Sequence, residues 1–305
     1  MNTPAVSVPV SVPNSRFDPR YYQIAVLTGL LVYGVGWLHF EIRGTQAAVT
    51  IVTALLTQFV CTRLWKLPAF DPKSALISAL SLCLLLRTDL LVFAAVAAVL
   101  AIANKFVVRW RGKHVFNPTN FAIVALLLTT PHVWVSPGQW GNVAFFAFLM
   151  ACLGGLVVNR AFRSDVTYAF LASYIGILFG YSAWLGHLPA VPLHRLENGA
   201  FLLFAFFMIS DPRTTPDRRI GRILFAVLVA IGGAFVPFVL YRTNGLLWSL
   251  ALFSLAVPLI DRLWPGARYQ WRPLTTRPGH APEGASYETP IARIPVPARV
   301  PARAT

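Results

Sequence analysis

Apolar runs long enough to cross a lipid bilayer recur along most of the chain, and they restrict the fold more than any other feature. A hydrocarbon core about 30 Å thick requires roughly 20 apolar residues per helix. The runs predict ten segments, which are approximately 22–39, 46–62, 74–87, 89–104, 117–131, 142–158, 167–186, 198–210, 220–240 and 245–262. The third, fifth and eighth are short for full spans. We therefore expect an all-α integral membrane protein.

The composition agrees with a chain whose main solvent is lipid. Only 12% of the 305 residues are charged and 56% are hydrophobic, whereas a soluble domain carries roughly 25% charged residues. The net charge of +15 comes from basic residues that lie between the apolar runs. Basic residues in that position face anionic lipid head groups. The charge therefore predicts contact with membrane lipids and not with nucleic acid.

The distribution of basic residues also predicts the orientation. Placing the N-terminus in the cytoplasm leaves only Arg43, Arg87, Arg195 and Arg242 on the outer side, out of 26 Lys and Arg residues. Cytoplasmic connections carry the excess of Lys and Arg in membrane proteins. We expect a multi-pass protein of a bacterial inner membrane with both termini in the cytoplasm.

The two ends of the chain differ from its apolar centre. Residues 1–20 form a Pro/Val/Ser tail without the apolar core of a signal peptide. Residues 265–305 are rich in Pro and Arg and have no periodicity, which is typical of disorder. The sequence thus predicts a disordered N-terminal tail (1–20), a transmembrane domain (21–264) and a disordered C-terminal tail (265–305).

Matched polar breaks indicate a 5+5 inverted repeat. In the first half, one run ends at residues 86–89 and the segment 116–120 opens another; in the second half, 206–212 and 241–245 repeat this arrangement. Helices that stop part-way expose backbone groups that lipid cannot satisfy. Such ends are tolerated around an enclosed cavity, where helix termini can hold a ligand.

The side chains at these breaks are the candidate cofactor-binding residues. They are Arg87, Asp89, Asn117, Thr119, Asn120, Asp211, Thr214, Thr215 and Asn244. The neutral hydrogen-bonding groups among them suit a flavin ring edge, a quinone carbonyl or a phosphate better than acid–base catalysis. Helix capping by Asn117 and Asn120, and local pairing of each Asp with the nearby Arg87 or Arg213, explain the same residues without a ligand.

Two of these blocks resemble the NqrB/RnfD membrane subunits of the sodium-translocating NADH:quinone oxidoreductase and the Rnf electron-transport complex. KHVFNPTNFAIVALLL (113–128) is similar to the family's FNP segment. ENGAFLLFAFFMISDPRTTPDRRIGRILFAVLVA (197–230) is similar to its G…FFMATDPVTSP…G pattern. The resemblance implies ten helices in an inverted repeat with broken helices, a flavin, electron transport and redox partner subunits.

The chain departs from the family at the flavin attachment motif. Family members attach FMN covalently to the threonine of an S-G-A-T motif, and the nearest string here is Ser164-Asp165-Val166-Thr167. We interpret Thr167 as a helix-start residue. The expected cofactor is therefore FMN or riboflavin bound without a covalent bond, or a quinone.

Three functions remain open at this point. The first is an electron-transport subunit, which would not oxidise NADH by itself because the chain has no Rossmann glycine pattern, P-loop or cysteine cluster. The second is an inverted-repeat channel or transporter for a small solute. The third is a cofactor-free structural subunit of a membrane complex.

Overall fold

The computed structural model describes residues 18–36, 42–135, 155, 163–196 and 198–269. The sixth predicted segment (142–158) lies almost entirely outside these residues, as do most of both predicted tails. The predicted N-terminal tail ends at residue 20, but Asp18 is already buried and the first helix begins at Pro19.

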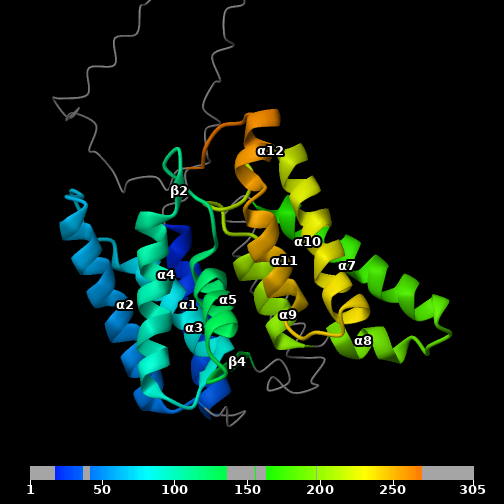
Figure 1. Cartoon of the computed structure of the whole chain (residues 1–305), viewed down its shortest axis with the longest axis horizontal. Helices are drawn as coiled ribbons and strands as arrows, with labels where there is room; N and C mark the ends of the chain where they lie inside the picture. Colours follow the sequence, from blue (N-terminus) through cyan, green and yellow to red (C-terminus); the bar gives the residue numbers. More distant parts are fainter. Residues whose placement is uncertain (1–17, 37–41, 136–154, 156–162, 197, 270–305) are drawn as a thin grey trace, which may run out of the picture. The chain divides into compact units, whose positions relative to one another are not determined.

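Helices make up most of the described chain (Figure 1). The helices are α1 (Pro19–Gly36), α2 (Gly44–Leu64), α3 (Pro72–Leu85), α4 (Leu91–Val107), α5 (Pro118–Thr129), α7 (Ser164–Trp184), α8 (Ala190–Leu196), α9 (Gly199–Leu203), the π-helix η1 (Phe204–Met208), α10 (Arg219–Val239), α11 (Gly245–Ser254) and α12 (Val257–Leu263). The strands are β1 (Leu86–Thr88), β2 (Arg109–Trp110), β3 (Lys113–His114) and β4 (Val133–Val135).

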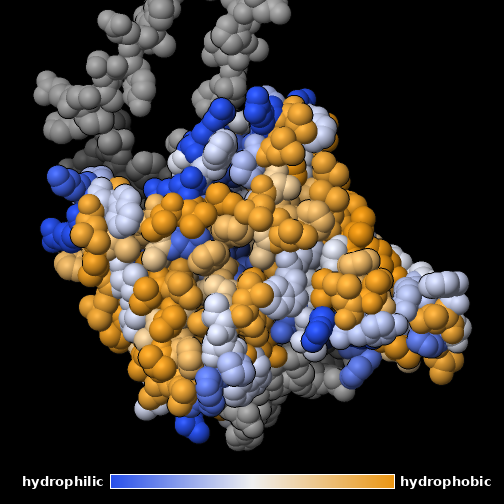
Figure 2. Space-filling view, viewed as in Figure 1, coloured by the Kyte–Doolittle hydropathy of each residue, from blue (hydrophilic) through white to orange (hydrophobic). Residues whose placement is uncertain are grey.

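The side of α2 that faces the protein is polar and the side that faces outward is apolar. Gln46, Thr50 and Gln58 are buried, whereas Leu56 and Val60 are exposed by 59% and 50%. A water-soluble helix shows the opposite pattern. Hydrophobic side chains likewise cover much of the face shown in Figure 2. The helices therefore present apolar side chains to lipid.

Three described helices are long and apolar enough to cross a membrane, namely α2, α7 and α10. The pair α11 and α12 makes a fourth span if the bent pair is counted as one. The helices α3, α4, α5 and the joined α9–η1 are apolar but shorter. The mostly helical membrane fold is thus confirmed at this level, while ten spans remain a prediction.

The predicted tenth segment is not one continuous helix. Its two parts, α11 and α12, meet at an angle of 48°. Pro258 lies in the first turn of α12 and has no N–H to donate to the carbonyl of Ser254. The chain instead makes tight turns there, in which Leu255 N–H donates to Leu252 O and Ala256 N–H to Phe253 O.

Two of the helix contacts in the first half have counterparts at the same places in the second half. In the first half α2 packs against α4, and α4 packs against α5. In the second half α7 packs against α10, and α10 packs against α11. A further contact joins α5 to α11 (Figure 1).

Glycines allow α10 and α11 to approach each other closely. A Cβ placed on Gly245 would lie 2.5 Å from the carbonyl oxygen of Gly233, and one on Gly233 would lie 2.5 Å from Leu246. Real Cβ atoms do not approach other atoms so closely. Small residues at helix interfaces are a common packing device in membranes, where lipid tails provide no hydrophobic driving force between helices.

Two small antiparallel sheets close the loops at opposite ends of the first-half helices, and the sequence analysis predicted neither. β1 pairs with β4, with Arg87 opposite Trp134. The backbone groups of β1, which directly follow the end of α3, are therefore hydrogen-bonded to β4. β2 pairs with β3 through a two-residue turn. Arg111 and Gly112 both have positive φ in that turn (49° and 81°), which the tight hairpin requires.

Candidate functional site

The N-terminal turns of α5 and α11 meet inside the protein. Asn120 in the first turn of α5 donates from Nδ2 to the carbonyl oxygen of Leu247 in the first turn of α11, at 3.2 Å. Asn117 is the N-cap of α5, and its side chain accepts from Asn120 N–H at 3.1 Å. Helix N-termini carry partial positive charge. This junction therefore favours a ligand that presents oxygen acceptors.

Asn117 also connects the two sequence blocks that the resemblance rests on. Its Nδ2 donates to Met208 O at 3.3 Å and to Asp211 Oδ2 at 3.4 Å. Asp211 in turn organises its own loop, because its Oδ1 accepts from Arg213 N–H at 3.0 Å. Burial raises the pKa of the Asp211 carboxyl, although the Arg213 N–H bond and nearby positive charges oppose this shift. The predicted residues Asn117 and Asp211 thus belong to one site.

The three predicted threonines are buried and hydrogen-bonded. Thr119 Oγ1 donates to Ser78 O at 3.4 Å, and Thr214 Oγ1 donates to Asp211 O at 3.3 Å. Thr215 Oγ1 accepts from Arg163 Nε at 3.1 Å. These bonds fix the backbone around Asn117 and Asp211, so the threonines are positioned to shape the site.

Two asparagine amides in this region have unused hydrogen-bonding atoms. Both side-chain polar atoms of Asn104 and the Oδ1 of Asn120 are buried without a hydrogen-bond partner among the described residues. Such atoms are costly in a folded protein, because each has lost its water without gaining a partner. Asn104 lies on α4 and Asn120 on the adjoining α5. The two residues thus contain two acceptor oxygens and one donor nitrogen without a partner among the described residues.

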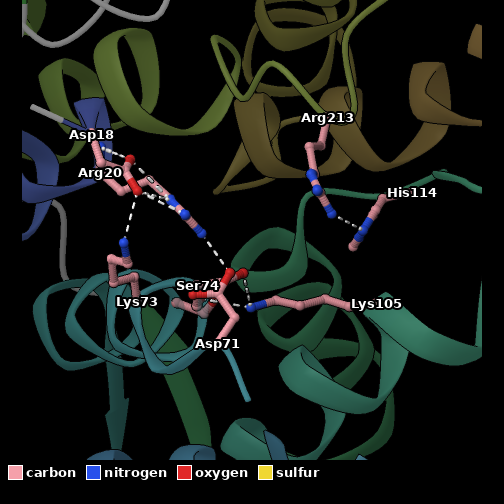
Figure 3. A network of polar contacts seen from close by, with 9 residues as sticks. Asp18, Arg20, Asp71, Lys73, Ser74, Lys105, His114 and Arg213 are labelled. Atoms are coloured by element: carbon pink, nitrogen blue, oxygen red, sulfur yellow. Dashed lines mark hydrogen bonds and ion pairs between the residues drawn. The ribbon is translucent and has the colours of Figure 1, made fainter. Parts of the chain in front are cut away.

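Next to Asn104, Lys105 is a buried cation that the sequence analysis did not select as a site residue. Its Nζ donates to the carbonyl oxygen and hydroxyl of Ser74 at 2.7 and 3.1 Å, and Figure 3 shows the side chain reaching from α4 to the start of α3. The signal in the sequence is the polar Asn104-Lys105 pair close to the end of an otherwise apolar helix.

Three of the predicted site residues, Arg87, Asp89 and Asn244, differ in their surroundings from Asn117 and Asp211. The guanidinium of Arg87 donates to Cys83 O and Leu86 O, both at 3.0 Å, which satisfies carbonyls at the end of α3. Asp89 contacts His132 Nδ1 at 2.8 Å with both side chains about half exposed. Asn244 is the N-cap residue of α11 with φ of 61°, but its side chain makes no capping bond. The expected position of Asp89 beside an enclosed cavity is therefore wrong, because its side chain is half exposed.

Ion pairs connect the helices at the end that carries β2 and β3. Figure 3 shows Arg20 between Asp18 and Asp71, with Lys73 also bonded to Asp18. Despite its burial, the hydrogen bonds from Arg20 and Lys73 lower the pKa of Asp18 to about 2. The remaining pairs at this end are Lys113 with Asp217 and Asp261, and Arg222 with Asp165.

Thr167 has the structural role that the sequence predicted. It lies in the first turn of α7 and is fully buried, and its hydroxyl donates to Ala205 O at 3.0 Å. This bond joins the first turn of α7 to η1. Cys61 and Cys83 are buried free thiols, and no cluster of metal-binding side chains occurs among the described residues.

The 197–230 block and the helices after it fall within a region that matches a known protein family. Residues 133–270 match the NQR2, RnfD, RnfE family. The predicted resemblance is confirmed for this region, which contains the 197–230 block and begins after the 113–128 block.

Several relatives are named as one of the subunits of an ion-translocating oxidoreductase complex. Those of Erwinia tasmaniensis and Haemophilus influenzae are each 32% identical, over 127 and 130 residues. That of Psychromonas ingrahamii is 35% identical over 125 residues. The matches cover 40–41% of this chain and 34% of each relative. The chain thus spans about a third of the length of these relatives, and the match supports a multi-pass membrane protein.

Proposed function

We propose that this chain is a membrane-embedded electron-transport subunit that binds a flavin without a covalent bond. The observation that carries the proposal is the bond from Asn117 to Met208 O and Asp211, which joins the two family-like blocks at one site. The relatives, by name subunits of an ion-translocating oxidoreductase complex, support the same class of function.

The unused amide atoms fit the chemistry of a flavin. A flavin ring edge presents two carbonyl oxygens on either side of an N–H group. The Asn104 amide can both donate and accept, and Asn120 Oδ1 can accept the N–H. When bound, the flavin supplies one- and two-electron redox chemistry. The protein's residues would hold the ring and keep water from it.

The pairing of the helices supports a 5+5 inverted repeat. The matched contacts α2–α4–α5 and α7–α10–α11 are those expected of two inverted five-helix sets. We accordingly place the transmembrane domain at residues 21–264, with the β2–β3 end and both termini in the cytoplasm of an inner membrane. Electrons would pass to and from partner subunits, because the relatives are by name subunits of a complex.

The test is the absorption spectrum of the purified full-length protein, followed by acid extraction. The expected result is a flavin spectrum with all flavin released by acid, and loss of the flavin in Asn117→Ala and Asp211→Ala. A colourless preparation from flavin-replete cells would overturn the proposal. In that case, the transporter function would be favoured if the wild type takes up a solute into proteoliposomes and Asp211→Ala abolishes this uptake.

A further inference from the structure

A polar pocket of about 180 Å³ lies beside the candidate flavin site. Its walls come from the β2–β3 hairpin, the loop after η1 and the residues after α12. The lining residues are Gly112, Lys113, His114, Pro212, Arg213, Asp217, Arg268 and Tyr269. His114 precedes Asn117 by three residues and Pro212 follows Asp211 directly, so the pocket adjoins the site through both blocks.

Positive charge exceeds negative charge in this pocket. Lys113 is bonded to both Asp217 and Asp261, at 2.9 and 2.6 Å, so these three groups carry one net negative charge, and Arg213 and Arg268 bring the sum to +1. Arg213 and Arg268 each line the pocket without a carboxylate in ion-pair distance among the described residues. The Arg268 guanidinium donates to a backbone carbonyl, Arg111 O. Two guanidinium groups therefore remain to attract an anion.

His114 holds one of these groups without neutralising it. Arg213 Nη1 lies 3.3 Å from His114 Nε2, and Figure 3 shows the two side chains pointing toward each other. Burial, with the positive charges of Arg213 and Lys105, lowers the pKa of His114 to about 3. The ring is thus neutral and accepts the bond, which leaves the other guanidinium N–H groups of Arg213 available.

The available groups match a phosphate in geometry and charge. A guanidinium presents paired N–H donors that bind phosphate oxygens two at a time. Arg213 stands in the DPRTTP segment where the family pattern has Val, so this charge is a feature of the present chain. Gly112 has no side chain to fill the pocket, and a Cβ there would make an ordinary contact with Arg268 Nη1, at 3.7 Å.

We propose that the pocket formed by Arg213, Arg268 and the β2–β3 hairpin binds a phosphate group. The phosphate can belong to a flavin mononucleotide whose ring lies at the Asn104–Asn120 site, and this source rests on the function proposed above. It can also belong to the head group of an anionic lipid. In the first case the protein selects FMN over riboflavin.

The test uses the full-length protein in nanodiscs of zwitterionic lipid, and flavin fluorescence measures the affinities for FMN and riboflavin. The variants are Arg213→Gln, which removes the charge from an exposed side chain, and Arg213→Lys, which retains it. Arg242→Gln is the matched control. Arg242 is exposed, lies in the connection between α10 and α11, and does not line the pocket. Retained lipid is measured by mass spectrometry after purification from native membranes.

We expect the wild type to bind FMN about tenfold more tightly than riboflavin, since a charge-assisted pair contributes about that factor. Arg213→Gln should remove this preference and leave riboflavin affinity unchanged, while Arg213→Lys should keep part of it. Equal flavin affinities, together with anionic lipid lost only in Arg213→Gln, support the phosphate site with lipid as its source.

Two results separate this proposal from the function proposed above. If flavin binds equally in all variants and lipid retention does not change, the phosphate site is refuted and the flavin-binding function stands. If neither flavin binds but Arg213-dependent lipid retention persists, the flavin function fails and the phosphate site stands.

Discussion

Asn117 combines a helix cap with a bond between distant parts of the chain. Its Oδ1 accepts from the first turn of α5, and its Nδ2 reaches the carbonyl of Met208 and the carboxylate of Asp211. An oxygen acceptor alone is sufficient for the first role, whereas only the amide nitrogen serves the second. The two roles can therefore be separated by substitution.

We expect Asn117→Ser to keep most of the stability and Asn117→Ala to lose about 1 kcal/mol, because serine is also a good N-cap. Both variants should release the flavin, since neither side chain is long enough to donate to Asp211. Thermal unfolding in detergent and the flavin absorbance of the same samples measure the two effects. Full flavin content in Asn117→Ser would show that capping is the only role of this residue.

The neutral state of His114 predicts a pH dependence. Its pKa is lowered to about 3 by burial and neighbouring cations, compared with about 6.5 in an unfolded chain. As the pH falls below 6.5, the unfolded state binds a proton that the folded state does not. Stability should therefore fall by up to about 1.4 kcal/mol per pH unit between pH 6.5 and 3.

Thermal unfolding at pH 7 and pH 5 measures this loss. The His114→Gln variant should be less sensitive to acid, because glutamine can still accept from Arg213 but does not titrate. His187→Gln, at an exposed position, is the control and should behave like the wild type. The same acid sensitivity in His114→Gln and the wild type would show that His114 is not the cause of the loss of stability in acid.

At the scale of helices, glycine positions let α10 and α11 pack closely against each other. The α10–α11 contact depends on positions where no side chain fits, and Ser249 Oγ reinforces it by donating to Val229 O at 2.8 Å. By contrast, Gly176 on α7 has nothing within 4 Å of the position its Cβ would occupy. The two kinds of glycine make a direct comparison possible.

Gly245→Ala should destabilise the protein by about 1–3 kcal/mol, because overpacking forces the helices apart. Gly176→Ala should be neutral or stabilising, since alanine favours a helix and meets no neighbour. The measurement is the unfolding temperature of each variant in the same detergent. Equal effects of the two substitutions would show that α10 and α11 are not in close contact.

The helices were more predictable from the sequence than the site. Hydropathy is a local property, so the apolar runs located α2, α7 and α10 to within a few residues. The Asn117 cap was also predicted, since capping involves neighbours in sequence. Strands of two or three residues, such as β1, have no usable periodicity, and that omission misplaced Asp89. The bond between Asn117 and Asp211 depends on tertiary packing, which no local pattern contains.

At the scale of the whole molecule, the two ends of the helices differ in their charges. The described ion pairs of Asp18, Lys113 and Arg222 lie at the β2–β3 end, whereas the other end has the exposed Asp89–His132 pair. Basic residues concentrate on the cytoplasmic side of membrane proteins. The asymmetry supports the proposed orientation, which can be tested in cells.

Single cysteines should report this orientation in a background where Cys61, Cys83 and Cys152 are replaced by alanine. Arg242→Cys should react with a membrane-impermeant maleimide in cells whose outer membrane has been made permeable and whose inner membrane is intact. Arg111→Cys should react only after the membrane is opened. Both wild-type side chains are exposed, so accessibility within the protein does not limit the reaction. The reverse labelling pattern would invert the topology.

The Lys113 ammonium group has a consequence for motion. It joins the β2–β3 hairpin of the first half to Asp217, in the loop after η1, and to Asp261 on α12. Any rocking of one half of the protein against the other would have to pull one cation away from two anions at this point. We therefore expect this end of the helices to move least in any such rocking, and we expect larger relative displacements at the opposite end.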